Sequence, residues 1–329
     1  MSAEGPSLRQ IQAVVKDELR FFDSYYREVL RTRVPLLDLI LRYMLRHKGK
    51  QLRPLMVYLC AGAAGGITRK THTAAVMVEL LHNATLVHDD VVDDSMQRRG
   101  FFSINALWKN KIAVLAGDFL LSRGLTVALD SDHFDLLRIT ARSVKEMAEG
   151  ELLQLEKARR LDITEEVYFE IIRRKTASLM AACCACGAAS ATDNPETIEF
   201  FRRWGELAGM AFQIKDDLLD YTGDSLRIGK PKINDLKEKK MTLPLIYALG
   251  KAEESTRRYI IGIVKRYGKV PARVEEVLNF IRMSGGPEYA EQKMLEFKAQ
   301  AEAMLESLNN DKYTEALRNL FIFILRRDH

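Results

Sequence analysis

Apolar residues recur at helical spacing along almost the whole of this 329-residue chain. Such a pattern predicts one helix after another, because apolar residues three and four positions apart line a single helix face. Few residues interrupt it, since the chain has only 19 glycines and 8 prolines. No segment alternates with a period of two between turn residues, so we expect no sheet. The predicted helices are Ile11–Leu30, Val34–Arg46, Leu55–Ala64, Thr71–Val92, Ile104–Leu129, Asp135–Leu155, Thr164–Ala191, Pro195–Asp220, Thr242–Ala252, Glu254–Tyr267, Ala272–Ser284, Pro287–Leu308 and Tyr313–Arg326.

No linker or low-complexity segment divides this helical pattern. We therefore expect one domain spanning residues 1–329 with an all-α fold, a single large helical bundle around a central cavity. The first ten residues lack the apolar core of a signal peptide, which predicts neither secretion nor import into an organelle. No uninterrupted run of ~20 apolar residues is present, so we expect no membrane-spanning segment.

The four cysteines bear on the cellular compartment of the protein, and the net charge bears on whether it binds nucleic acid. Cys183, Cys184 and Cys186 crowd into an alanine-rich run, and Cys60 stands apart. This spacing suits neither a disulfide framework nor paired zinc ligands, so we expect reduced, packed thiols and a cytoplasmic protein. A formal net charge of +5 is too small to indicate binding to nucleic acid.

Two apolar helices of the predicted bundle end in the same acidic pattern. Each has two adjacent aspartates and a third within one helical turn, so carboxylates four positions apart share a helix face. Like charges at this spacing, next to the negative end of a helix dipole, oppose folding unless a cation binds. Carboxylate oxygens suit Mg²⁺, which takes one or two of them and fills its other positions with water and phosphate. The two clusters are Asp89, Asp90 and Asp93, and Asp216, Asp217 and Asp220.

A solvated acidic helix end is the alternative interpretation of either cluster alone. The repeat of one spacing at two apolar helix ends favours magnesium sites that grip one diphosphate. The chain also has several basic residues and a histidine near the clusters. The alternative interpretation of any one of them alone is an ordinary surface or core residue. Together they indicate an anionic substrate, because arginine binds phosphate through parallel hydrogen bonds and lysine as a point charge. These residues are Lys50, Arg53, His82, Arg98, Arg99, Lys175 and Lys230.

These motifs resemble those of the trans-isoprenyl diphosphate synthases, and specifically of the branch that makes long polyprenyl diphosphates. The resemblance covers most of the chain and departs at none of the motif positions, although no motif is identified beyond Tyr267. The matching segments are Gly49–Pro54, His82–Asp93, Arg98–Gly100, Ala116–Leu120, Lys175–Thr176, Phe212–Asp220, Gly229–Pro231 and Lys240–Pro244.

The resemblance implies a role for each matching residue. Magnesium ions would be held by Asp89, Asp93 and Asp216, with Asp90, Asp217 and Asp220 in support. The allylic diphosphate would be bound by Arg98, Lys175, Thr176, Gln213, Lys230 and Lys240. Isopentenyl diphosphate would be bound by Lys50, Arg53, His82 and Arg99.

The chemistry that the family implies is a magnesium-dependent, head-to-tail condensation of isopentenyl diphosphate with an allylic diphosphate, carried out by a homodimer. Magnesium and cationic side chains would make the allylic diphosphate a good leaving group. The double bond of isopentenyl diphosphate would attack the resulting cation, which the dipoles of Thr176 and Gln213 would stabilise, and the released pyrophosphate could take the proton. Because the product is again an allylic diphosphate, the cycle can repeat.

Product length would depend on the helix that ends at Asp89. One turn of this helix rises ~5.4 Å, close to the length of one isoprene unit. The turn before Asp89 carries the small residues Ala84 and Thr85, where short-chain relatives often have a bulky aromatic floor. We therefore expect a product of about C25 or longer, in the range of C30–C40, for a quinone side chain or a similar lipid. Deeper floors for the product would be Leu81, Met77 or Val78.

Four alternatives remain. A geranylgeranyl or farnesyl diphosphate synthase would share these motifs and differ in product length. A terpene cyclase normally replaces the second acidic motif and needs no site for isopentenyl diphosphate. A di-iron bundle would need Glu-x-x-His pairs on a buried face, which we do not find. A regulatory subunit of a heteromeric synthase would tend to lose the aspartates that this chain keeps.

Overall fold

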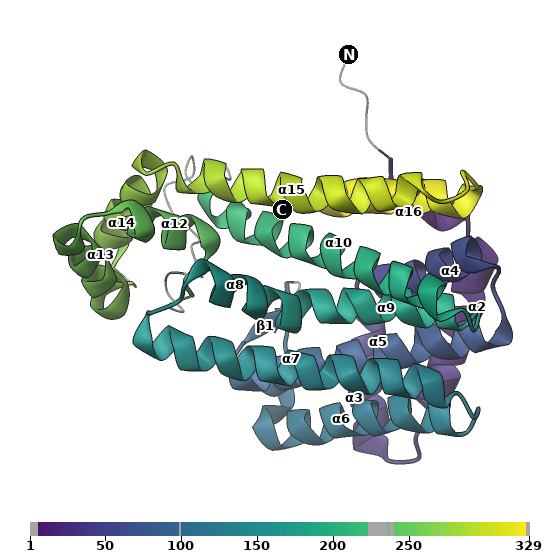
Figure 1. Cartoon of the computed structure of the whole chain (residues 1–329). Coiled ribbons are helices and arrows are strands. Elements are labelled where there is room, and N and C mark those ends of the chain that lie inside the picture. Colours follow the sequence, from purple (N-terminus) through teal and green to yellow (C-terminus); the bar gives the residue numbers. More distant parts are fainter. Residues whose placement is uncertain (1–5, 99, 223–235, 237–239, 269, 327–329) are drawn as a thin grey trace.

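The computed structural model describes residues 6–98, 100–222, 236, 240–268 and 270–326. Within these residues the chain is almost entirely helical, which confirms the predicted all-α fold (Figure 1). The helices are α1 (Leu8–Ala13), α2 (Lys16–Val29), α3 (Pro35–Arg46), α4 (Leu52–Ala64), α5 (Arg69–Val92), α6 (Ile104–Leu129), α7 (Phe134–Arg160), α8 (Glu165–Ile172), η1 (Arg173–Ala177), α9 (Ser178–Ala189), α10 (Pro195–Thr222), α12 (Leu243–Lys251), α13 (Glu254–Tyr267), α14 (Pro271–Met283), α15 (Gly286–Glu306) and α16 (Lys312–Leu325).

Helix α9 lies at the centre of the bundle. It is apolar on every side and all of its residues are buried, as expected of a helix enclosed by others. Helices α4, α5, α7 and α10 pack around it. The four cysteines, three on α9 and one on α4, are buried and free, as predicted.

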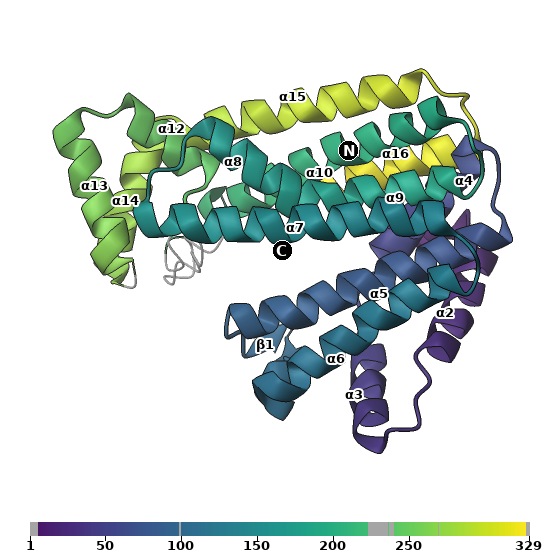
Figure 2. The same cartoon turned by 60° about the horizontal axis from the view of Figure 1, so that its bottom comes forward.

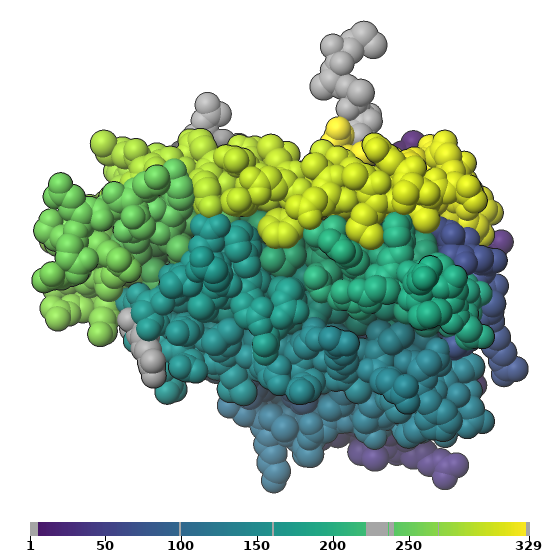
Figure 3. Space-filling model, viewed as in Figure 1, coloured from purple at the N-terminus to yellow at the C-terminus, as the bar shows by residue number. Residues whose placement is uncertain are grey.

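The other long helices form layers around this centre. Helices α5 and α6 run side by side, and in Figure 2 they diverge from α7 and α9 toward the end of α5 that lies next to β1. Helices α12, α13 and α14 gather at one end of the bundle (Figures 1 and 2). The C-terminal helices α15 and α16 lie along the helices from the middle of the chain (Figure 3), and α16 also contacts α4 and α1.

Side-chain caps fix the starts of α6 and α8. Ser103 Oγ accepts a hydrogen bond from the backbone amide of Ala106 at 3.0 Å at the start of α6. Thr164 Oγ1 accepts one from the amide of Val167 at 3.4 Å at the start of α8. Each cap satisfies an N–H group that has no partner within the first helical turn. The start of α8 is therefore well defined, which sets the position of Tyr168 one turn later.

Two predicted helices are divided into separate elements in the structure, and a third, α6, has a kink at Lys109, whose φ of 70° and ψ of 164° are not helical. The segment Ile11–Leu30 breaks at Val15, whose φ of −130° and ψ of 39° separate α1 from α2. The segment Thr164–Ala191 contains η1, a five-residue π-helical turn between α8 and α9. A π turn widens the helix locally and is frequent at functional sites. The apolar pattern continues through both breaks, so periodicity alone did not reveal them.

The expectation of no sheet is wrong in one place. The short strands β1 (Gln97–Arg98) and β2 (Phe101–Phe102) pair in an antiparallel ladder. Gly100, between them, has a φ of 81°, a conformation that glycine adopts readily and other residues rarely do. Strands of two residues are too short to produce a pattern of period two, which explains the error.

Helix α6 is, within the part of the chain that the structure describes, the single helix long and apolar enough to cross a membrane. This finding rests on length and composition only. It is weak support for a membrane span, because a core helix of a globular protein meets the same criteria.

Candidate active site

A cavity of about 320 Å³ lies between α7, α8, η1, α10 and the segment before α12, and we call it cavity A. It gathers residues that are far apart in the sequence, from both the second aspartate cluster and the predicted allylic diphosphate site. The predicted residues that line it are Lys175, Thr176, Gln213, Asp216, Asp217, Asp220 and Lys240. Lys230, predicted for the same diphosphate, lies outside the described residues.

A chain of hydrogen bonds connects α8, η1 and α10 along the wall of cavity A. The Tyr168 hydroxyl donates to Asp217 Oδ2 at 2.6 Å, and Gln213 Nε2 donates to Asp217 Oδ1 at 2.8 Å. The Thr176 hydroxyl donates to Gln213 Oε1 at 2.7 Å. Burial raises the pKa of Asp217 to about 7, although both hydrogen bonds to the carboxylate oppose this rise.

The first aspartate cluster stands at the C-terminal end of α5. Its middle member, Asp90, is buried and accepts a hydrogen bond from Arg98 Nε at 2.8 Å, with Arg98 Nη2 at 2.7 Å from the same oxygen. Burial raises the pKa of Asp89 to about 6. The positive charge of Lys175 opposes this rise, and the negative charge of Glu151 adds to it. Lys175 therefore acts on the first cluster while it lines cavity A, so it links the two clusters.

Three polar residues of this site were missed by the motifs. Glu151 of α7 forms an ion pair with Lys175, and Gln154 Oε1 lies 3.5 Å from Lys175 Nζ. Tyr168 of α8 is the third. Helix spacing gives only a weak signal for them, because Tyr168 stands about two turns before Lys175 and the other two are three residues apart, but their partners lie in other helices.

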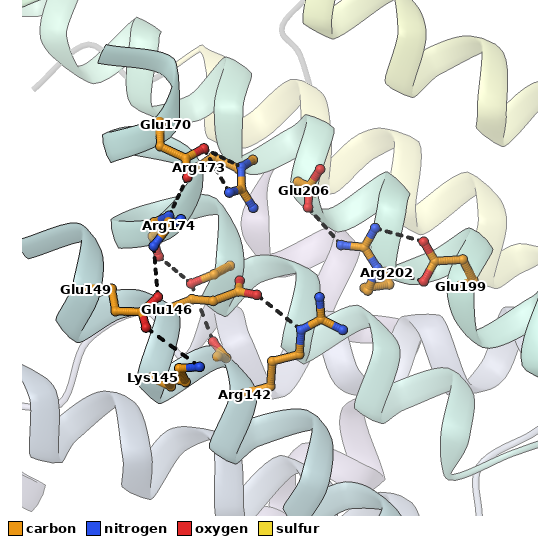
Figure 4. A network of polar contacts seen from close by, with 12 residues as sticks. Arg142, Lys145, Glu146, Glu149, Glu170, Arg173, Arg174, Glu199, Arg202 and Glu206 are labelled. Atoms are coloured by element: carbon orange, nitrogen blue, oxygen red, sulfur yellow. Dashed lines mark hydrogen bonds and ion pairs between the residues drawn. The ribbon is translucent and has the colours of Figure 1, made fainter. Parts of the chain in front are cut away.

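The π turn η1 directs neighbouring side chains to opposite sides. Arg174 points outward into a network of ion pairs, where it bridges Glu149 of α7 and Glu170 of α8 (Figure 4). Lys175 and Thr176, the next two residues, line cavity A. The arginine thus attaches the turn to the bundle surface while the lysine and threonine face the cavity.

Two glycines allow neighbouring helices to approach η1 closely. A Cβ atom on Gly150 of α7 would stand 2.9 Å from the backbone nitrogen of Lys175. A Cβ atom on Gly209 of α10 would stand 2.6 Å from Ala177 Cα. Side chains at these positions would push the backbones apart, since protein interiors are close-packed. Backbone packing on two sides therefore holds the turn that carries Lys175 and Thr176.

A second cavity, of about 540 Å³, contains the predicted residues for isopentenyl diphosphate, and we call it cavity B. Lys50, Arg53 and His82 line it, and they come from the start of α4 and from α5. No member of either aspartate cluster is among the described residues that line it. Arg99, the fourth predicted residue, lies outside the described residues.

Cavity B adjoins cavity A. Phe212 lines cavity B and its neighbour Gln213 lines cavity A, both on α10. Met180 of α9 lines cavity B one helical turn after Thr176, which lines cavity A. The two cavities are therefore lined by neighbouring residues of α10 and by residues one helical turn apart at the junction of η1 and α9.

Arg98 and the residues predicted to limit product length lie outside both cavities. Arg98 shares a smaller cavity of about 90 Å³ with its partner Asp90. Ala84 and Leu81 are buried in α5, and the Thr85 hydroxyl donates to the backbone carbonyl of His82 at 2.8 Å. None of these three α5 residues is among the described residues that line cavity A or B, so their role in product length stays a prediction.

The donors of the two clusters fit Mg²⁺. Across the described ranges, no three His, Cys, Asp or Glu side chains gather closely enough to hold an ion by themselves. Mg²⁺ does not need such a group, because it usually takes one or two carboxylates and completes its shell with water and phosphate. Burial raises the pKa of Asp89, and a bound Mg²⁺ ion would lower it.

Known proteins resemble the chain over nearly its full length. The sequence profile of the polyprenyl synthetase family matches residues 34–281. An all-trans-nonaprenyl-diphosphate synthase (geranyl-diphosphate specific) of Rhodobacter capsulatus is 38% identical over 97% of this chain and 98% of its own length. A short chain isoprenyl diphosphate synthase of Methanothermobacter thermautotrophicus is 32% identical over 98% of this chain and 100% of its own.

Solved structures also resemble this chain over nearly its full length. A decaprenyl diphosphate synthase from Rhodobacter capsulatus superposes with a TM-score of 0.92 at 30% identity, covering 98% of this chain and 100% of that one. A polyprenyl synthase from Caulobacter crescentus, complexed with calcium and isoprenyl diphosphate, gives a TM-score of 0.89 at 31% identity and covers 99% of both chains.

Proposed function

This chain belongs to the polyprenyl synthetase family, and on that premise we propose that cavities A and B are the two substrate subsites of one prenyl-transfer reaction. The protein is a prenyltransferase whose relatives include synthases of long-chain trans-prenyl diphosphates. In the proposal, cavity A and the aspartate clusters bind the allylic diphosphate together with Mg²⁺. Cavity B binds isopentenyl diphosphate.

The different charges of the two cavities carry this proposal. Cavity B is lined by Lys50, Arg53 and His82 and by one acidic residue, Glu79, but by no aspartate of either cluster, which suits a diphosphate bound directly by cationic side chains. Cavity A combines aspartates with Lys175 and Lys240, which suits a diphosphate bound through bridging metal ions. A terpene cyclase needs only one diphosphate subsite, so the second cationic cavity favours the synthase.

The residues around cavity A suit the ionisation of an allylic diphosphate. Bound Mg²⁺ would neutralise charge on the leaving diphosphate. Lys175 adds a fixed positive charge beside it, and Thr176 and Gln213 present oxygen dipoles to the carbon where positive charge develops. The C–O bond breaks, the double bond of isopentenyl diphosphate forms the new C–C bond, and a proton leaves to the released pyrophosphate. The residues that would hold the ions are Asp89, Asp93 and Asp216.

We propose a product of about C25 or longer, whose length is limited by residues of α5 in the turns before Asp89. The small side chain of Ala84, in the turns before Asp89, supports this, because it places no large ring at that position. Ala84→Phe should shorten the product by at least one isoprene unit, as measured by chromatography of the hydrolysed products. Ala84→Ser is the matched control and should keep the wild-type length. An unchanged product length in the phenylalanine variant would contradict this account of the limit.

We also propose a cytoplasmic, single-domain protein that forms a homodimer through α6. The packing of α16 on α4 supports one domain, and the four free cysteines suit a reducing compartment. The outer face of α6 exposes large apolar residues that a second copy would cover. These residues are Leu107, Val114, Leu115, Leu125 and Leu129. Leu115→Arg should convert the dimer to a monomer in analytical ultracentrifugation, whereas a monomeric wild type would refute the dimer.

The function is tested by incubation with labelled isopentenyl diphosphate, Mg²⁺ and each allylic primer in turn, followed by sizing of the products. We expect repeated incorporation that yields products of about C25 or longer and that stops in excess EDTA. Products that stop after one or two additions would favour the short-chain alternative. Absence of incorporation with every primer would overturn the proposed function.

A further inference from the structure

We propose that Tyr168 is a positioning residue for prenyl transfer, which acts through Asp217 to orient the amide of Gln213 toward the reacting allylic carbon. The inference rests on the proposed function of cavity A. It adds a residue from α8 that belongs to none of the sequence motifs, and it gives Asp217 a task different from that of its neighbour Asp216.

The polarity of the hydrogen-bond chain fixes the orientation of Gln213. Gln213 Nε2 donates to Asp217 Oδ1 at 2.8 Å, so the NH₂ group of the amide faces the carboxyl group. The amide carbonyl oxygen, Oε1, then lies at the other end, where it accepts from Thr176 at 2.7 Å. The reversed amide would turn its oxygen toward Asp217 Oδ1 and its NH₂ group toward the donating hydroxyl of Thr176, so both hydrogen bonds would be lost.

Tyr168 fixes the other half of the same carboxylate. Its hydroxyl donates to Asp217 Oδ2 at 2.6 Å, so both carboxylate oxygens accept hydrogen bonds from protein donors. Tyr168 is 3% exposed and Asp217 is 8% exposed. Hydrogen bonds at such depth are stronger than in water, and a missing partner is correspondingly costly. Asp216, by contrast, is exposed, so the adjacent aspartates of the second cluster have different surroundings.

This arrangement would matter at the moment of ionisation. Preorganised dipoles stabilise a developing charge only if they already point toward it, because reorientation would cost free energy during the reaction. Gln213 and Thr176 line cavity A, and their near neighbours in the chain, Phe212 and Met180, line cavity B. In the proposed function, the allylic carbon would react between the two cavities. A carboxylate anchored at both oxygens prevents Gln213 from rotating away from this position.

The test is Tyr168→Phe, which removes one hydroxyl and keeps the ring that packs in α8. A small misplacement of a positioned group can cost up to about 100-fold in rate, so we expect kcat to fall by about 10- to 100-fold. The KM values for both diphosphates should change by less than about threefold, because no substrate contact is removed. An unchanged kcat in Tyr168→Phe, with an active wild type, would overturn the inference and leave the proposed function intact.

Tyr289→Phe is the matched control. The Tyr289 hydroxyl lies 2.8 and 2.9 Å from the two carboxylate oxygens of Glu165, so it also anchors α8 through a phenol–carboxylate contact. Tyr289 does not line cavity A. We expect wild-type kcat in this variant even if its thermal unfolding midpoint falls as far as that of Tyr168→Phe. Equal losses of kcat in the two variants would mean that Tyr168 only stabilises α8, and would overturn the inference.

A double-mutant cycle tests the connection to Gln213 directly. In a Gln213→Met background there is no amide to orient, so Tyr168→Phe should lower kcat by less than about twofold. Losses that multiply in the double variant would show that Tyr168 acts independently of Gln213 and would overturn the proposal. Absence of turnover in the wild type would instead count against the proposed function itself.

Discussion

The middle aspartate of the first cluster, Asp90, pairs with the guanidinium of Arg98, whereas the middle aspartate of the second, Asp217, is held by a phenol and an amide. The two clusters have the same spacing and both end long helices, so the sequence presents them as copies. Their hydrogen-bond donors differ: Asp90 accepts from a positively charged guanidinium, whereas Asp217 accepts from a neutral phenol and a neutral amide, with the charge of Lys240 also acting on it. Burial accordingly raises the pKa of Asp217 to about 7.

This difference shows that residues at equivalent positions of a repeated motif can have different roles. A charged partner keeps a buried carboxylate ionised, while neutral donors orient it without removing the cost of burying its charge. The outer aspartates, Asp89 and Asp216, are less buried than the middle ones and are better placed for metal ions. The middle aspartates accept hydrogen bonds from protein groups, from Arg98 in one cluster and from Gln213 in the other.

The largest effect should come from an outer aspartate. Asp89→Ala should lower turnover by more than about 100-fold while leaving the fold intact, because a proposed ligand of the metal is lost and the side chain is only half-buried. The measurement is steady-state kinetics at saturating Mg²⁺, with circular dichroism to monitor folding. Asp94→Asn is the control, since Asp94 is exposed and its φ of 48° is tolerated by asparagine. Near-normal turnover in Asp89→Ala would remove Asp89 from the proposed metal site.

The middle aspartates should respond to neutralisation with opposite signs. Asp90→Asn removes the partner of Arg98 and should lower the free energy of unfolding by about 1–3 kcal/mol. Asp217→Asn should raise it by about 1–2 kcal/mol at pH 8, because the folded carboxyl titrates near 7 and the unfolded one near its ordinary 3.8. Asparagine can still accept from Gln213 and donate to the Tyr168 oxygen.

Urea denaturation in EDTA at pH 8 measures both values. Two changes of the same sign would show that the clusters are equivalent after all. The effect of Asp217→Asn on the free energy of unfolding should also depend on pH. The folded state holds its proton between pH 3.8 and about 7, so the wild type loses stability as pH rises through this window.

A smaller effect distinguishes neighbours within the first cluster. Burial raises the pKa of Asp89 to about 6, so its ionisation destabilises the folded protein above that pH. Asp89→Asn should therefore stabilise the protein by about 1 kcal/mol at pH 8, a value reduced by the partial exposure of the side chain. The gain should disappear at pH 4, below which both states are protonated. A gain that persists at pH 4 would mean that charge is not the cause.

Local geometry explains which parts of this site the sequence could predict. Carboxylates four residues apart share a helix face wherever the helix lies, so the two clusters follow from spacing alone. Lys50, Arg53 and His82 were grouped only through the family resemblance, and the structure gathers them in cavity B. The helices were predicted from periodicity, but the break at Val15 was not, because the apolar pattern continues through it.

The residues that were missed owe their roles to distant partners. Tyr168 is an ordinary buried tyrosine until Asp217, 49 residues away, is brought against it. Glu151 is a similar case, because its role depends on its ion pair with Lys175, which lies in another helix. The π turn that directs Lys175 into cavity A also depends on tertiary packing, because Gly150 and Gly209 admit it from two sides.

The central claim is that the aspartate clusters bind one diphosphate through Mg²⁺ while cavity B binds the other without it. Calorimetric titration tests this with isopentenyl diphosphate and, separately, with an allylic thiodiphosphate that ionises too slowly to react, each in Mg²⁺ and in EDTA. We predict that EDTA abolishes binding of the allylic analogue and changes the affinity for isopentenyl diphosphate by less than about threefold. Equal dependence of both ligands on Mg²⁺, or of neither, would contradict the division between the two cavities.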